Sequence, residues 1–494
     1  MQTAAPNLVV AFGADRSWHR PTIFSANEIF AGPRCETVVD QGRVRSVKTP
    51  PGQFDMVSLV RQLPPGQQPE ALVVQVDRTG TTLARNLHAV GGRKILYLTD
   101  TMHMPGPIRF VLDYALTEKY DLVLGECCRQ HLHYFIEAGL ETRWLPLATL
   151  NPFPVVPGQP IQYPVSFVGS AGKFHPYRRW VLQTLVERKV PITCLTMPQA
   201  ETPQVFARSR VNVNVTLNGG MNFRLLETLA AGAFLLYDRQ SPQVGMDCIL
   251  TEGEDLVTYA DHEDLVERIG HYLANPGEAQ RIAERGHQTY LARHTPEIRT
   301  RQFHDLVFRG AVEPQHALAL EPRCRRPVVP YDALIERIRA YEYVQEEHRK
   351  ALRLEVAATA SVSSLLLSDL ADLWRSTIAV ECPDDGAYRR RQFFFASEAV
   401  DGKIALRRSL DGVFSGKAMS LLIVTGEDLR LLDRLDRLGR APNHVVVEGG
   451  RSRLDLGALA GLTDAMARRG YLLSDPALPA FRRGLGDSFE IPTA

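Results

Sequence analysis

The segment NGGMNFRLLETLAAGAFLLYD (218–238) holds the residues of this 494-residue sequence whose types and spacing best suit chemistry. Gly219 and Gly220 come directly before an expected helix, where residues without side chains let backbone amides approach a ligand. Arg224 can form a bidentate contact with a phosphate. Glu227, near the mouth of the same helix, can accept hydrogen bonds from ribose hydroxyls. Together these residues predict a site for a nucleoside diphosphate; a plain turn followed by two surface charges is the alternative.

A second segment, SFVGSAGKFHPYRRW (166–180), contains a buried strand followed by a loop of small residues and then a helix. Gly169 and Ser170 stand at the carboxyl end of the strand, where ligands bind in open α/β sheets. Lys173 can neutralise a phosphate there, with Arg178 and its neighbour as weaker candidates. The spacing fits neither a P-loop nor a G-x-G-x-x-G turn. A generic strand–turn–helix is the alternative for this segment taken alone.

Metal binding by protein ligands is not predicted. The seven cysteines are scattered and form no C-x-x-C pair, so we expect reduced and mostly buried thiols. The fourteen histidines show no H-E-x-x-H spacing.

The elements that must position these residues alternate between strands and helices. Apolar runs at 8–12, 71–76, 94–99, 121–125 and 142–147 predict strands of a parallel sheet covered on both faces. Helices are expected between them, at Thr81–Val90 and at Arg129–Ala138, the latter ended by Gly139. The stretch from Cys35 to Gln68 has little periodicity.

A proline-rich stretch (151–164) interrupts this alternation and predicts an interdomain linker. After it the pattern restarts. Expected strands are 165–169, 191–196, 210–216, 233–238 and 256–259, and expected helices are 177–188, 223–231, 262–274 and 277–292. Two successive α/β units joined by a short linker follow from this pattern.

A second boundary is expected at 310–330. Beyond it, 331–356 has helical periodicity with dense opposite charges, typical of a packed or solvated helix, with a partner-binding helix as the alternative. From Arg389 onward, short apolar runs with helices between them predict a third, smaller α/β unit.

The overall charge excludes some classes of function. Lys plus Arg total 57 and Asp plus Glu total 56, a balance that argues against a nucleic-acid binder or a polybasic membrane anchor. The start of the chain lacks the pattern of a signal peptide, and no apolar run approaches the length of a membrane span. A soluble, cytoplasmic protein is the expectation.

Residues 165–310 resemble the second domain of GT-B glycosyltransferases, in particular the group related to the spore-maturation proteins CgeB and YkvP. The resemblance rests on FVGS with its following arginine-containing helix, on MNFRLLETLAAGAFLLYD, and on the segment 252–295 with its His-Thr ending. The first domain is also similar to the group, at 86–100 and 120–148. The implied fold is two Rossmann-like domains that face a cleft.

The resemblance implies that the second domain holds a nucleotide-sugar donor. Glu227 matches the glutamate expected on the donor ribose, Arg224 and Asn222 match positions near the phosphates, and Gly169 with Ser170 matches the loop that faces them. Many related retaining enzymes carry a second acidic residue where this chain has Gly219, which leaves the stereochemistry open. Such enzymes usually need no metal.

Basic side chains would then stabilise the departing diphosphate, a role assigned to Arg224 and Lys173. If the reaction inverts, a base should come from the first domain. Asp100 and His103, directly after a buried strand, are the best candidates, and Asp77 is the runner-up. A helix cap or turn is the alternative role for Asp100, and a structural role for His103.

The C-terminal segment 421–475 is similar to the closing half of FkbM-type methyltransferases, with Gly426-Glu427 and Gly470-Tyr471 at the corresponding places. The glycine-rich strand–turn–helix of the opening half is missing. An accessory domain without catalysis is therefore expected.

The sequence thus predicts an α/β glycosyltransferase of GT-B type that moves a hexose-type sugar from a UDP-, GDP- or dTDP-sugar to a hydroxyl of a glycan, protein or small molecule. A sugar-nucleotide-binding protein without catalysis, a GT-B-like epimerase and a bifunctional transferase–methyltransferase are the alternatives. Self-association through the helix at 331–356 is a further possibility. The expected divisions are two Rossmann-like domains, a helical connector and an accessory α/β domain, at 1–150, 161–310, 331–380 and 386–494.

Overall fold

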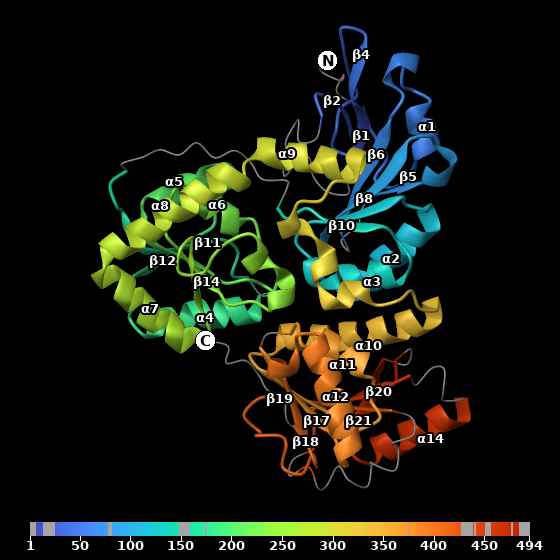
Figure 1. Ribbon diagram of the computed structural model, residues 1–494, viewed down its shortest axis with the longest axis vertical. Coiled ribbons are helices and arrows are strands. Elements are labelled where there is room, and N and C mark those ends of the chain that lie inside the picture. The colour runs from blue at the N-terminus through green and yellow to red at the C-terminus, as the bar shows by residue number, and fades with distance from the viewer. Residues whose placement is uncertain are drawn as a thin grey trace. The chain divides into compact units, whose positions relative to one another are not determined.

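The structure is a computed structural model that describes residues 6–12, 25–77, 82–147, 159–172, 175–373, 375–425, 438, 441–449, 456–475 and 478–483. The chain forms two compact units, Met1–Cys324 and Arg325–Ala494 (Figure 1). Among the helices that the structure describes, none combines the length and the apolar character that crossing a bilayer requires.

The first sheet of the first unit has eight strands in the order β10-β9-β8-β6-β1-β2-β4-β3. Its strands are β1 (Asn7–Phe12), β2 (Asn27–Gly32), β3 (Val38–Asp40), β4 (Arg43–Lys48), β6 (Ala71–Asp77), β8 (Arg93–Asp100), β9 (Leu122–Gly125) and β10 (Thr142–Trp144). All neighbours pair in parallel except β3 and β4. The five apolar runs of the N-terminal region all contain strands of this sheet.

The N-terminal helices are short. They are α1 (Met56–Val60), α2 (Pro107–Glu118) and α3 (Leu132–Glu137), the last preceded by a 3-10 turn at Arg129–His131. Gly139 follows α3 with a φ of 83°, a left-handed conformation that suits glycine at a helix end. The helix expected at Thr81–Val90 is wrong, because Thr82–Arg85 forms strand β7 beside β5 (Gly52–Asp55). Here, pairing with a strand from a distant segment outweighs the local preference of the sequence for a helix.

The second sheet has five parallel strands in the order β12-β11-β13-β14-β15. They are β11 (Tyr163–Val168), β12 (Ile192–Leu195), β13 (Ser209–Asn214), β14 (Leu235–Asp238) and β15 (Val257–Tyr259). The helices are α4 (Pro176–Glu187), α5 (Thr202–Ala207), α6 (Arg224–Ala230), α7 (His262–Ala274) and α8 (Pro276–Arg293). The doubly wound order confirms the expected α/β class with two Rossmann-like sheets in the GT-B manner.

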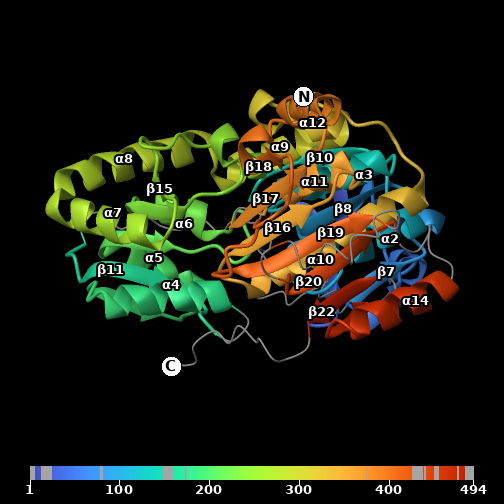
Figure 2. The ribbon, with the colours of Figure 1, turned by 90° about the horizontal axis from the view of Figure 1, so that it is seen from below.

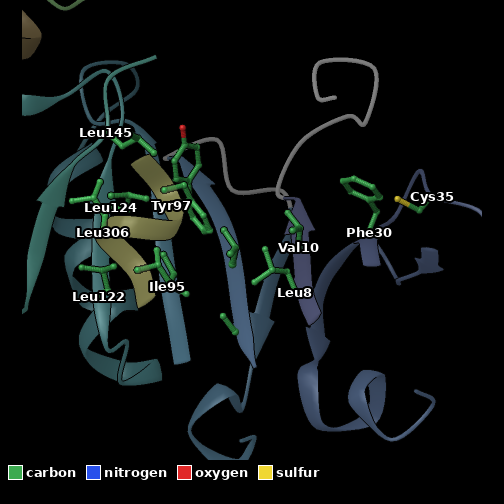
Figure 3. Close-up of a cluster of buried hydrophobic side chains, with 14 residues drawn as sticks. Leu8, Val10, Phe30, Cys35, Ile95, Tyr97, Leu122, Leu124, Leu145 and Leu306 are labelled. Carbon is green, nitrogen blue, oxygen red and sulfur yellow. The ribbon is translucent and has the colours of Figure 1, made fainter. Parts of the chain in front are cut away.

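After α8 the chain returns to the first domain. Helix α9 (Pro296–His304) leads into a π-helical turn at Asp305–Arg309, and Phe303, Leu306 and Val307 are buried in one cluster with the side chains of the first sheet. Figure 3 shows Leu306 beside Leu122 and Leu124. The first hydrophobic core is therefore completed by residues that follow the second sheet.

The second unit contains one seven-stranded sheet, in the order β18-β17-β16-β19-β20-β22-β21 (Figure 2). Its strands are β16 (Leu354–Ala358), β17 (Ser376–Glu381), β18 (Ile404–Arg407), β19 (Met419–Thr425), β20 (His444–Glu448), β21 (Tyr471–Asp475) and β22 (Ala480–Arg483). The helices are α10 (Tyr331–Lys350), α11 (Ser364–Leu370), α12 (Asp385–Ser397) and α14 (Leu456–Ala467). Only β22 runs antiparallel to its neighbours.

This sheet corrects the division expected for the last third of the chain. The segment 331–380 is not a helical connector, because it contributes β16 and most of β17 to the same sheet as the strands after 386. The helix expected at 331–356 ends at Lys350, and the apolar residues after it form β16. An opening strand–loop–helix, which the sequence had suggested was missing, is thus present as β16 and α11, although its loop contains no glycine.

Candidate functional site

The loop after β11 meets the first turn of α6 at Gly169 and Arg224. Gly169 has a φ of 148°, and a Cβ atom built there would lie 2.3 Å from the Nη2 atom of Arg224. The absence of a side chain at 169 therefore lets the guanidinium lie directly on the backbone at the carboxyl end of β11. Two segments that the sequence singled out separately are brought together here.

A second buried guanidinium lies beside the first. Arg178 of α4 and Arg224 both stand over the ring of Phe167, with Cζ atoms 5.5 Å and 5.7 Å from the ring centroid. Arg178 donates to the carbonyl oxygens of Ser170 and Val215, both at 2.8 Å. Its side chain thereby ties the loop after β11 to the loop after β13.

The pKa values of both guanidinium groups are lowered. Burial and then the neighbouring Arg224 lower the pKa of Arg178 to about 9, and burial lowers the pKa of Arg224, opposed by the charge of Glu227. Among the described residues neither guanidinium forms an ion pair with a carboxylate. Concentrated positive charge of this kind in a partly desolvated place suits an anionic ligand.

Glu227 is held at the base of the same site. It is 4% exposed, and its Oε1 accepts a hydrogen bond from the Nε2 of Gln199 at 2.5 Å. Burial raises its pKa, opposed by the Gln199 bond and by Arg224. The carboxylate is therefore desolvated but oriented, as a group that recognises hydroxyls must be.

The loop between β13 and α6 is held in place by hydrogen bonds to Asp238, at the end of β14. Asp238 accepts hydrogen bonds from the backbone nitrogen of Thr216 at 2.8 Å and from the Thr216 hydroxyl. Asn214 also reaches this carboxylate, and Asn222 Nδ2 in turn donates to Asn214 Oδ1 at 3.1 Å. Asn222, expected near phosphates, thus has its amide nitrogen engaged within the loop.

The glycine pair meets the first domain. A Cβ atom at Gly220 would lie 2.3 Å from the end of the Met102 side chain, and Asn218 Nδ2 donates to the Met102 carbonyl at 3.0 Å. Gln130 Nε2 lies 3.5 Å from the carbonyl oxygen of Gly219. Gly219 and Gly220 therefore allow close approach between the carboxyl-end loops of the two sheets.

Asp100 and His103 lie on that first-domain loop and form a dyad. His103 Nδ1 is hydrogen-bonded to Asp100 Oδ2, and Asp100 Oδ1 also accepts from the Met102 nitrogen at 2.7 Å. Burial raises the pKa of Asp100, but His103 and the backbone amides outweigh it, so the pKa is lowered overall. His103 Nε2 is buried and has no hydrogen-bond partner within the described part of the chain.

The structure thus gathers Gly169, Ser170, Arg224 and Glu227 around the carboxyl ends of β11 and β13, with Asp100 and His103 on the adjoining loop. Lys173 and the side chain of Asp77 lie outside the described residues. The sequence ranked Arg178 too low and missed Gln199 and Asp238. The only sequence signal for Asp238 was its place at the end of an apolar strand.

The residues described in the structure contain no group of three His, Cys, Asp or Glu side chains placed to hold a metal ion.

Residues 165–305 match the family model described as glycosyl transferase-like. This part of the chain is similar to glycosyl transferase-like domains. The match includes the contact between Gly169 and Arg224 as well as Glu227, and it confirms the predicted glycosyltransferase class. No curated protein matches the sequence.

Solved structures similar to this chain include a sucrose-phosphate synthase from Thermosynechococcus elongatus, at 12% identity and a TM-score of 0.43, covering 62% of this chain and 100% of that one. HepE from Anabaena, in complex with UDP and glucose, has 11% identity and a TM-score of 0.41, covering 60% and 98%. A ribosomal protein L11 methylase from Lactobacillus delbrueckii has 16% identity and a TM-score of 0.24, covering 31% and 80%. At these values none of the three informs on the substrate of this chain.

Proposed function

We propose that the glycosyl transferase-like domain holds the donor, a nucleoside-diphosphate sugar, and that the chain transfers the sugar to a hydroxyl of an acceptor. The observation that carries this proposal is the pair of guanidinium groups over Phe167, which are desolvated and form no direct ion pair with a carboxylate of the described residues. A diphosphate supplies the charge that such a pair lacks.

Arg224 is the group that contacts the diphosphate. Its guanidinium is in place on Gly169 before the ligand arrives, so little reorganisation is needed when negative charge develops on the leaving group. Arg178 is tied to two carbonyls and acts as a positioning residue that also raises the local potential. These residues supply the charge stabilisation that a divalent cation supplies in other transferases, so the proposed reaction needs no metal.

Glu227 binds the ribose of the donor. Gln199 fixes the Oε1 atom, and hydroxyls of the sugar ring can donate to Oε2. UDP and GDP carry the same ribose, so this contact does not select between them, whereas dTDP carries a deoxyribose that lacks the 2′-hydroxyl.

His103 is the proposed base. Asp100 accepts a hydrogen bond from the Nδ1–H of His103, which leaves Nε2 as the atom that can accept a proton from the acceptor hydroxyl. As the proton leaves, the hydroxyl oxygen attacks the anomeric carbon, the bond to the diphosphate breaks, and the electron pair passes to the phosphate oxygen beside Arg224. Direct attack of this kind inverts the anomeric configuration.

The donor site is tested by calorimetric titration of the full chain with UDP, GDP and dTDP. We expect one of them to bind, and Glu227→Ala to weaken this binding about 10- to 150-fold, since a lost charged hydrogen bond costs about 1.5–3 kcal/mol. Glu263→Ala, an exposed glutamate of the same domain, is the matched control. Binding of none of the three, or binding that Glu227→Ala leaves unchanged, would overturn the donor site.

Transfer itself is tested with the sugar nucleotide of the base so identified. Release of the nucleoside diphosphate that rises with added acceptor supports a transferase. Release without any acceptor-linked sugar, or none in the presence of tight donor binding, supports an epimerase or a binding protein in its place.

A further inference from the structure

A buried arginine joins three parts of the first unit that are far apart in the sequence. Arg129 begins the 3-10 turn after β9, on the first sheet, and is 5% exposed. Its Nη1 atom donates to the carbonyl oxygen of Gln243, in the loop after β14 of the second sheet, at 2.9 Å. The same atom donates to Oε2 of Glu321, in the segment that follows α9, at 2.9 Å. Both sheets and this segment therefore meet at one guanidinium.

Trp144 and Gly245 enclose the Arg129 side chain. Arg129 Cζ lies 5.1 Å from the ring centroid of Trp144, a fully buried residue of β10. Gly245, in the loop after β14, has a φ of 80°, and a Cβ atom built there would lie 2.5 Å from Arg129 Cδ and 2.9 Å from Trp144 Cη2. A side chain at 245 would therefore push the loop of the second sheet away from the first sheet.

The 3-10 turn after β9 also contacts both loops of the proposed reaction. His131 Nδ1 is hydrogen-bonded to the Thr101 hydroxyl at 2.7 Å, and both side chains are buried. Thr101 belongs to the base loop, residues 101–106, which carries His103. Gln130 Nε2, in the same turn, lies 3.5 Å from the first carbonyl oxygen of the glycine pair at the donor site. The placement of the base loop therefore depends on the turn that Arg129 begins.

Sugar transfer needs the base loop and the donor site in one fixed relation. The proposed base lies on the first sheet and Arg224 lies on the second, and a misplacement of about 1 Å can cost about 100-fold in rate. We infer that Arg129 is a positioning residue for this reaction, which holds the base loop at the donor site through the turn that it begins. The inference rests on the proposed function. It goes beyond a role in stability, because it makes the distance between the two sheets depend on Arg129.

Arg129→Met tests the inference in the full chain. The substitution keeps an apolar stem against Trp144 but removes the hydrogen bonds that join the sheets. Arg85→Met is the matched control. Arg85 also pairs with a buried glutamate, Glu118, at 3.3 Å, and lies 5.3 Å from the ring centroid of Tyr114, but all three residues belong to the first domain.

Gly245→Ala disturbs the same contact from the second sheet and leaves the ion pair of Arg129 in place. The added methyl group meets the arginine stem, so the two loops must separate. Gly253→Ala is its control, because Gly253 has a φ of 79° and imposes the same backbone strain. A Cβ atom there would meet no atom of the described residues within 4 Å.

The first readout is the distance between the two domains, which requires no activity. Pulsed electron paramagnetic resonance measures it between spin labels on unnatural amino acids at two exposed positions, Arg61 after α1 and Glu267 on α7. We expect one narrow distribution in the parent and both controls, and a broader or shifted one in Arg129→Met and Gly245→Ala. The second readout is transfer. In these two variants kcat should fall about 10- to 100-fold, while the affinity for the nucleoside diphosphate stays within twofold.

Near-ultraviolet circular dichroism checks that each variant is folded; if Arg129→Met is not, Gly245→Ala decides. The inference is overturned if the folded variants keep the distance distribution of the parent, if the distribution changes while kcat does not, or if the controls share the fall in kcat. A parent that binds no donor and transfers no sugar overturns the proposed function instead, and the distances alone then decide whether Arg129 joins the two domains.

Discussion

At the scale of single residues, the donor site is distinguished by two guanidinium groups that form no direct ion pair with a carboxylate of the described residues. Arg224 rests on Gly169, whereas Arg129 and Arg326 form buried ion pairs with Glu321 and Glu398. A buried ion pair holds its charges for structure, but an unpaired buried cation is retained at a cost that ligand binding offsets.

Arg224→Ala should therefore weaken binding of the nucleoside diphosphate about 100-fold, as measured by calorimetric titration, because a charge-assisted bidentate contact is lost. The matched control is Arg179→Ala, an exposed arginine of α4. Equal effects of the two substitutions would show that the anion is attracted by general surface charge, not by a defined contact.

His103→Ala and Asp100→Asn should separate catalysis from binding. Loss of a general base costs about 10²–10⁴-fold in rate, so kcat for sugar transfer should fall by that order while the affinity for the diphosphate stays within twofold. An unchanged kcat in both variants would assign the dyad to loop structure.

The residue types of the donor site were readable from the sequence, but their partners were not. The spacing of Gly219, Gly220, Arg224 and Glu227 was visible within one segment. By contrast, Gln199 reaches Glu227 from another helix, and Arg178 became important only because its side chain turns back toward two loop carbonyls. Contacts between distant segments have no local signature.

At the scale of elements, the backbone conformation after β11 controls how the arginine is presented. Gly169→Ala places a methyl group against the Arg224 guanidinium and in a φ region that side chains rarely adopt. We expect about tenfold weaker binding of the diphosphate, measured in the same titration. Gly172→Ala, in the same loop with its nearest contact at an ordinary 3.7 Å, should bind as the parent does.

The junction between α8 and α9 should make the first unit sensitive to acid. His294 Nδ1 accepts a hydrogen bond from Arg299 Nη2 at 2.6 Å. Burial and the charge of this guanidinium lower the pKa of His294 to about 2. The unfolded chain takes up a proton below about pH 6.5 and the folded chain does not, so stability present at neutral pH is lost as the pH falls. At pH 5 the loss from His294 is about 2 kcal/mol.

Urea unfolding at pH 7.5 and pH 5 checks this expectation. His294→Gln should lose less stability between the two pH values than the parent, and the exposed His271→Gln should behave as the parent does. An identical pH dependence in all three proteins would contradict the burial-driven shift. His316, whose pKa burial and Arg299 lower to about 3, adds a loss of the same sign.

The positions of the central strands were predicted better from the sequence than the strands with which they pair. Apolar runs identified the central strands of both sheets in the first unit, because a parallel strand is buried on both faces. Two errors share one cause: β7 and β16 were assigned to helical segments, and each is a strand because a distant strand pairs with it. Strands β3 and β4, at one edge of the first sheet, lie in the stretch from Cys35 to Gln68, which has little periodicity.

At the scale of the whole molecule, the chain is two compact units, and the proposed donor site lies in the first of them. Calorimetry of the full chain should resolve two transitions, and the diphosphate that binds should raise one of them. At a hundred times its dissociation constant it stabilises by about 2.7 kcal/mol. If both transitions moved together, the units would be unfolding as one body.

The return of α9 to the first domain also has a consequence for biosynthesis. Residues Phe303, Leu306 and Val307 complete the core that contains Leu8 and Ile95, so the core of the first sheet cannot close until the whole second sheet has been translated (Figure 3). At a translation rate of about 5–20 residues per second, the apolar strands of the first sheet stay exposed for roughly ten seconds or longer before Val307 is synthesised. Chaperone demand during translation should accordingly peak before residue 307, and a message truncated between the two sheets yields a product that has lost the closure of its first domain.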